Sequence, residues 1–134
     1  TEPINYYNLG IMLSKDPAKM TEAIEAFKKA TELKPDYADA WQNLAYATIG
    51  DDSKAVDEIN AARKAQKTEV ATKLLEARRA RAAAAVPYAE KWYQVDSNNI
   101  EAVRLLKGLY QTGKNDVKAA EFKAKEEAMK ATQK

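Results

Sequence analysis

The 134-residue sequence contains no histidine and no cysteine. Histidine is the commonest general base near neutral pH, and the cysteine thiolate is a strong nucleophile. Their absence also excludes disulfides and the ligands that zinc prefers. The serines are Ser14, Ser53 and Ser97, and all three fall where turns or helix caps are expected. The sequence therefore predicts a non-catalytic protein that has no metal site and no cofactor.

Helix-breaking residues are also scarce, because glycine and proline contribute only four residues each. The long stretches between them are rich in Ala, Glu, Lys and Leu, which favour helix. No apolar run approaches the ~20 residues that a membrane-spanning helix needs. Apolar residues make up 46% and charged residues 31%, as in ordinary globular domains. We therefore expect one all-α domain over residues 1–134 that does not span a membrane.

Turn residues and apolar spacings divide the chain into six expected helices, at about 4–13, 18–33, 38–66, 68–95, 100–112 and 116–130. Pro87 lies deep inside the fourth helix, where it is expected to cause a kink and not an end. Tyr6, Trp41 and Trp92 are expected in the core. The last helix is expected to bury the face formed by Val117, Ala120, Ala124 and Ala128, with Phe122 and Met129 alongside it.

The segment 50–53 leaves two interpretations of the third helix open. Gly50, followed by two aspartates and Ser53, has the composition of a helix break. The apolar positions on either side nevertheless keep one helical phase (Trp41, Ala45, Thr48, Ala55, Ile59 and Ala62). We favour one helix over 38–66 that is loosened or kinked at Gly50.

Three segments carry the pattern of a known repeat, W-x2-L-G-x2-Y, then A-x3-F, then P. Tyr6-x2-Leu9-Gly10-x2-Leu13 is followed by Ala23-x3-Phe27-x2-Ala30 and by Pro35. The pattern starts again at Trp41-x2-Leu44-Ala45-x2-Thr48 and, in degenerate form, at Val103-x2-Leu106-Lys107-x2-Tyr110. The chain thus resembles tetratricopeptide repeat (TPR) proteins. This resemblance implies a right-handed superhelical array of antiparallel helical hairpins that binds other proteins.

The second unit is longer than one repeat. Ser97 occupies the place of its closing proline and lies 62 positions after Pro35, against ~34 residues for one repeat and ~68 for two. Two shortened repeats remain possible, but the unbroken periodicity favours one stretched hairpin. We expect hairpins over about 3–34, 37–95 and 100–130, the last being a degenerate cap. Residues 87–91 and 95–99 resemble a stretch of bacterial TPR proteins with an elongated middle hairpin.

The resemblance also implies a partner site on the concave groove, which the first helix of each hairpin lines. Asn8 and Asn43 precede the conserved leucines, and their amides could hydrogen-bond an extended peptide. The further expected groove residues are Tyr7, Ile11, Gln42, Tyr46, Arg104 and Gln111. A role in helix packing within the repeat would explain the presence of Asn8 and Asn43 at these positions equally well. Tyr7 and Ile11 replace the lysine and asparagine with which chaperone-binding relatives clamp a carboxylate, so that type of partner is not expected.

A basic stretch supports an alternative function. Residues 61–94 carry eight cations and three carboxylates, a net charge of +5 within a chain of net charge +2. Lys73, Arg78, Arg79 and Arg81 could form a patch for nucleic acid or another acidic surface. No nucleic-acid-reading motif accompanies them, so a solvated face is favoured. A third alternative is self-association into a homo-oligomer.

The compartment is not determined by the sequence. Absence of cysteine is compatible with oxidising and reducing compartments alike. The chain starts at Thr1 without an initiator methionine or a charged-then-apolar leader, so we expect it to be trimmed at the N-terminus. The resemblance leaves the bacterial cytoplasm and the periplasm as alternatives.

Overall fold

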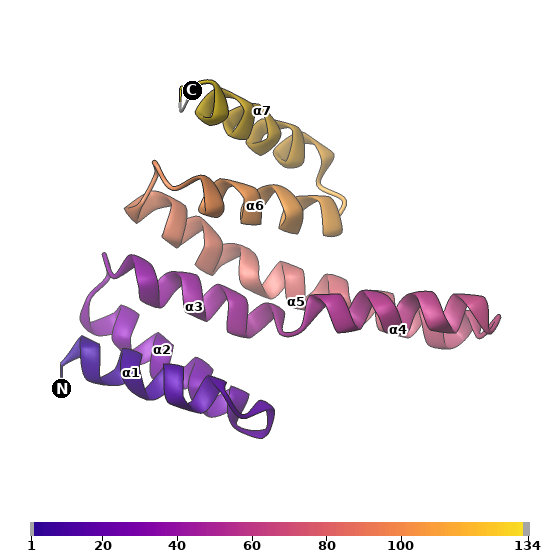
Figure 1. Ribbon diagram of the computed structural model, residues 1–134, viewed down its shortest axis with the longest axis horizontal. Coiled ribbons are helices and arrows are strands. Elements are labelled where there is room, and N and C mark those ends of the chain that lie inside the picture. The colour runs from indigo at the N-terminus through magenta and orange to yellow at the C-terminus, as the bar shows by residue number, and fades with distance from the viewer. Residues whose placement is uncertain (1, 133–134) are drawn as a thin grey trace.

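The computed structural model describes residues 2–132, which form helices and no strands. Most helices run antiparallel to the one before and stack into an array, with α1 at one end and α7 at the other (Figure 1). In chain order the elements are α1 (Pro3–Ser14), η1 (Pro17–Lys19, a 3-10 helix), α2 (Met20–Leu33), α3 (Ala38–Ile49), α4 (Asp52–Lys64), α5 (Thr68–Val95), α6 (Ile100–Thr112) and α7 (Asp116–Thr132).

Gly10 allows α1 and α2 to pack closely. It is buried, and a Cβ atom placed on it would lie 2.5 Å from a ring carbon of Phe27. Phe27 is 1% exposed, and Tyr7 packs on its ring at a centroid distance of 6.0 Å. The glycine of the repeat pattern is therefore required by a close contact between two helices.

The segment 38–66 forms two helices, so the expectation of one continuous helix was wrong. Gly50 adopts φ +73° and ψ −157°, a conformation that residues with a side chain rarely adopt, and α3 ends there. Asp51 then caps α4, because its carboxylate accepts a hydrogen bond from the backbone N–H of Lys54 at 3.0 Å. The apolar phase survives the break because α4 continues the direction of α3 along α5 (Figure 1).

The helix α5 is unbroken for 28 residues and continues through Pro87, as the sequence predicted. Its first half packs against α4 and its second half against α3. The helix α4 has substantial contacts only with α5. Together, α4 and the first half of α5 project beyond the stacked helices as a two-helix arm, residues 52–77 (Figure 1).

The aromatic residues that were expected in the core are buried to different degrees. Trp92 is 1% exposed, whereas Tyr6 and Trp41 are half-buried. The indole N–H of Trp41 donates to the carbonyl oxygen of Pro35 at 2.7 Å, and its ring stacks on Tyr88. Trp41 therefore fixes the turn between α2 and α3 as well as filling space between helices.

Phe122 anchors α7 to the rest of the array. Its ring lies between Tyr93 of α5 and Tyr110 of α6, with centroid distances of 5.4 Å and 5.8 Å. The buried residues of α7 are Ala119, Phe122 and Glu126.

The expected buried face of the last helix was wrong. Val117, Ala120, Ala124 and Ala128 are all exposed, Val117 to 81%. In an α-helix these four positions lie on the side opposite Phe122. Alanines occur on both sides of α7, so they do not mark its buried face.

Two glycines in equivalent helices should respond in opposite ways to a methyl group. Gly10→Ala should destabilise the protein by about 1–3 kcal/mol, because the new methyl would overlap Phe27. Gly108→Ala should instead stabilise it by about 0.5–1 kcal/mol, because nothing lies within 4 Å of the added Cβ and alanine favours helix. Urea unfolding of both variants measures this difference, and changes of the same sign would contradict it.

Candidate functional site

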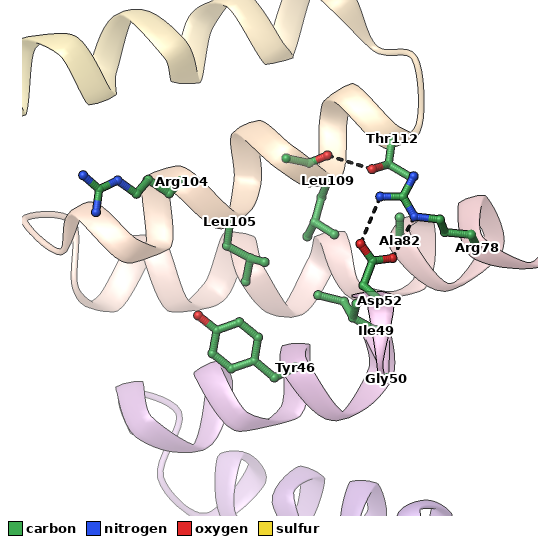
Figure 2. A pocket seen from close by; sticks show the side chains of 11 residues that line it. Tyr46, Ile49, Gly50, Asp52, Arg78, Ala82, Arg104, Leu105, Leu109 and Thr112 are labelled. Atoms are coloured by element: carbon green, nitrogen blue, oxygen red, sulfur yellow. Dashed lines mark hydrogen bonds and ion pairs between the residues drawn. The ribbon is translucent and has the colours of Figure 1, made fainter. Parts of the chain in front are cut away.

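A cleft with a volume of ≈ 330 Å³ lies between α3 and α6, with α5 beneath it (Figure 2). We call it the α3–α6 cleft. Apolar side chains form its centre, and charged residues lie at its two ends. Its lining consists of Tyr46, Ile49, Gly50, Asp52, Arg78, Ala82, Arg104, Leu105, Gly108, Leu109 and Thr112.

Tyr46 and Gly108 give the cleft its shape. The Tyr46 side chain is 42% exposed, and its ring is held edge-on against the buried Trp92 at a centroid distance of 6.0 Å. Gly108 lies on α6, and its missing side chain leaves open space, since a Cβ atom there would have no neighbour within 4 Å. The cleft therefore has a fixed aromatic wall and room for an apolar group.

An ion pair closes one end of the cleft at the break between α3 and α4. Arg78 donates two hydrogen bonds to the carboxylate of Asp52, at 2.7 Å and 2.9 Å, and these hold the pKa of Asp52 below its ordinary value. Arg81 donates to the carbonyl oxygen of Ile49 at 3.2 Å, which the end of α3 would otherwise leave unpaired. Two arginines of α5 thus fasten the break.

Arg104 stands at the other end and is also paired. It donates to Glu101 at 2.7 Å and to Glu126 of α7 at 2.9 Å. Glu126 is buried and also accepts a hydrogen bond from Lys107 at 2.7 Å. The hydrogen bonds from Lys107 and Arg104 hold the pKa of Glu126 below its ordinary value of about 4.5. Both arginines of the cleft are therefore neutralised by carboxylates.

A second cavity of ≈ 240 Å³ lies on the other side of α3, toward the first hairpin. Tyr46 and Gly50 line both cavities, so the Tyr46 side chain separates them. The remaining lining residues of the second cavity are Ser14, Met20, Phe27, Asn43, Ala47 and Asp51.

The structure brings only part of the expected groove set together. Tyr46 and Arg104 line the α3–α6 cleft, and Asn43 lines the second cavity. Asn43 donates both to the hydroxyl oxygen of Tyr7 and to the carbonyl oxygen of Asp39, which supports a packing role for its amide. The other expected residues line neither cavity: Tyr7 and Ile11 pack in the core of the first hairpin, Gln42 is half-buried, and Asn8 and Gln111 are exposed.

Sequence reasoning missed most of the cleft. Ile49, Leu105 and Leu109 were not expected in a site, since their apolar side chains look like ordinary core positions. Gly108 is the residue whose position in the sequence could have indicated the cleft. A glycine inside an expected helix, away from any turn, usually has a packing or functional reason.

The expected basic patch does not form one free surface. Arg78 and Arg81 are used within the fold, at the break described above. Arg79 is half-buried, and its Nε atom is buried without a hydrogen-bond partner in the described chain. Lys73 is the exposed residue among the four. Of the other cations in the basic stretch, Arg63, Lys64 and Lys67 are exposed farther out along the arm, and Lys91 is exposed near the opposite end of α5.

Residues 2–132 lack the features of two other classes of site. No group of three or more acidic, histidine or cysteine side chains is placed to hold a metal ion there. No helix in this range is both long enough and apolar enough to cross a membrane.

The antiparallel stacking of helices defines the protein as an all-α helical repeat array. Residues 19–50, which span α2 and α3, match the family model of the TPR repeat. This segment of the chain is therefore similar to a TPR repeat. A comparison with curated proteins finds no match for the sequence.

The buried carboxylate should make stability depend on pH. Because the folded-state pKa of Glu126 is lowered, its ion pairs stabilise the protein above about pH 4.5, and this contribution is lost as pH falls through the folded-state value. Glu126→Gln should therefore lower the melting temperature near neutral pH and flatten its decline in acid. Thermal unfolding across this range measures both effects. Glu127→Gln, an exposed neighbour, should keep the wild-type slope, and equal slopes for all three proteins would contradict the assignment.

Proposed function

We propose that the protein is a non-catalytic interaction module that binds an extended segment of a protein partner in the α3–α6 cleft. The observation that carries this proposal is the apolar cleft between two helices of a TPR-type array. A fixed aromatic wall and a preformed space reduce the entropy that binding costs. The TPR match supports a protein partner, and the absence of histidine and cysteine supports a function without catalysis.

The charges around the cleft indicate the chemistry of the bound side chain. Arg78 is paired with Asp52, and Arg104 with Glu101 and Glu126. A carboxylate of the partner would have to displace these pairs before it could use either arginine. The centre of the cleft is lined by Tyr46, Leu105 and Leu109. We therefore infer an uncharged apolar anchor, such as an aliphatic or aromatic side chain.

The second cavity also indicates how far apart two anchor side chains of the bound segment should lie. The two cavities lie on opposite sides of α3, and a helix with its side chains is about 10 Å across. A segment in the extended polyproline II conformation advances about 3.1 Å per residue with three residues per turn, so side chains three positions apart point the same way and lie about 9 Å apart. A segment that crosses Tyr46 would thus place two side chains about three positions apart in the two cavities.

A displayed library of random peptides tests the cleft. The wild-type protein should enrich peptides that carry two apolar residues about three positions apart. Gly108→Leu should weaken the selected peptides by about 10–100-fold, because the new side chain occupies the space of one buried anchor. Binding is measured by fluorescence anisotropy after circular dichroism has confirmed the fold.

Ala120→Leu provides the control, since it places the same leucine side chain on the exposed side of α7. This variant should bind the selected peptides as the wild type does. Equal affinity for wild type and Gly108→Leu would place the peptides elsewhere and overturn the assignment of the cleft.

Self-association is a second candidate function, which the surface of α1 supports. No charged residue occurs from Pro3 to Ser14, and three large apolar side chains are exposed: Ile4 to 45%, Leu9 to 45% and Met12 to 68%. Exposed apolar surface of this kind often marks a contact with another protein. An uncharged face can also meet its own copy across a two-fold axis without repulsion.

Light scattering over a range of concentrations tests this second candidate. The wild type should shift from monomer toward dimer, and Leu9→Lys with Met12→Lys should remain monomeric. Val117→Lys changes an apolar residue that is 81% exposed at the opposite end of the array and should leave the dimer intact. A wild-type monomer at every concentration would exclude self-association through α1.

A further inference from the structure

We propose that the tip of the arm is a docking site for an anionic lipid surface. The tip comprises the end of α4, the turn that follows it and the first turns of α5, residues 60–73. It carries four cations and one carboxylate, Glu69. The tip is a surface distinct from the α3–α6 cleft, and lipid binding there does not depend on what the cleft binds.

The fold gathers these cations at one place. Gln66 adopts φ +58°, and the backbone N–H of Lys67 donates to the carbonyl oxygen of Ala62 at 2.8 Å, so the chain reverses tightly. The end of α4 and the start of α5 therefore lie side by side at the far end of the arm (Figure 1). The four cations there are Arg63, Lys64, Lys67 and Lys73, and all of them are exposed.

The tip cations are available to a partner, in contrast to the arginines at the base of the arm. None of the four forms an ion pair with another described residue. Arg78 and Arg81, by contrast, are hydrogen-bonded within the fold. Apart from Arg79 and Lys91, the basic stretch of the sequence thus separates into a structural part at the base of the arm and a free part at its tip.

The tip is also electrostatically separate from the cleft. The helix α4 has 13 residues and is therefore about 20 Å long. This length exceeds the Debye length of about 8 Å at physiological ionic strength. A charge bound near Lys64 and Lys67, at the far end of the tip, would consequently have little effect on the ion pairs that line the cleft.

The composition of the arm favours a lipid surface over other polyanions. Residues 52–87 contain no aromatic side chain on which bases could stack, and a two-helix tip is wider than the single helix that a DNA major groove admits. Protein interfaces use aromatic and arginine anchors and are depleted in lysine, whereas three of the four tip cations are lysines. Val70, which is 48% exposed among these cations, suits the apolar boundary beneath lipid headgroups.

Vesicle co-sedimentation of the 134-residue chain tests the proposal. The protein should bind phosphatidylcholine vesicles that contain roughly one-third phosphatidylglycerol, and not vesicles of phosphatidylcholine alone. Each cation near an anionic surface contributes about fivefold, so Lys64→Gln with Lys67→Gln should lower the partition coefficient roughly thirtyfold. Gly108→Leu, the cleft variant, should bind vesicles as the wild type does, which separates this test from that of the proposed function.

Lys15→Gln with Lys19→Gln is the matched control. It removes the same charge from another exposed hairpin turn, between α1 and α2, and should leave the partition coefficient unchanged. An equal loss in both double variants would overturn a specific tip site. Absence of binding to the anionic vesicles, or tighter binding to a duplex DNA oligomer that the tip variant alone weakens, would overturn the lipid assignment.

Discussion

The packing of α5 against α3 and α4 in succession is the contact on which the rest of the molecule depends. The buried positions of α5 are mostly alanines, which allow close approach, and Trp92 fills the space near its end. Because α5 is longer than either partner, it carries α4 beyond the stack and still provides a surface for α6. The floor of the α3–α6 cleft and the position of the arm both follow from this one helix.

The interruption at Gly50 connects these two features. It leaves the carbonyl end of α3 and the start of α4 at the edge of the cleft, where Arg81 and Arg78 of α5 satisfy them. The same arginines looked like part of a surface patch in the sequence. Their use within the fold neutralises one end of the cleft, whereas Arg63, Lys64 and Lys67 stay accessible farther out on the arm.

The helices and the repeat character could be predicted from local signals, and the arrangement of the sites could not. Pro35, Gly10 and Phe27 mark turns and close contacts directly in the sequence. At Gly50 the preserved spacing of apolar residues predicted one continuous helix. The structure has two helices instead, and because both lie in line along α5, their apolar residues keep the spacing of a single helix. In α7, alanines on both faces concealed the buried side until Phe122 was placed. The cleft needs side chains from four helices, whose juxtaposition depends on tertiary packing.

The arrangement of contacts also bears on how the chain folds. Apart from α4, which packs on α5 alone, each helix has its main contacts with the helices next to it in the stack, and the first and last hairpins are separated by α3 and α5. Except for α3 and α5, which pair across α4, the helices in contact follow one another in the chain, and such contacts lower the contact order and favour rapid folding. Such a chain can begin to fold at any hairpin, and a lesion in a terminal hairpin need not disrupt the other end. The arm, held along one side only, should be the first part to open.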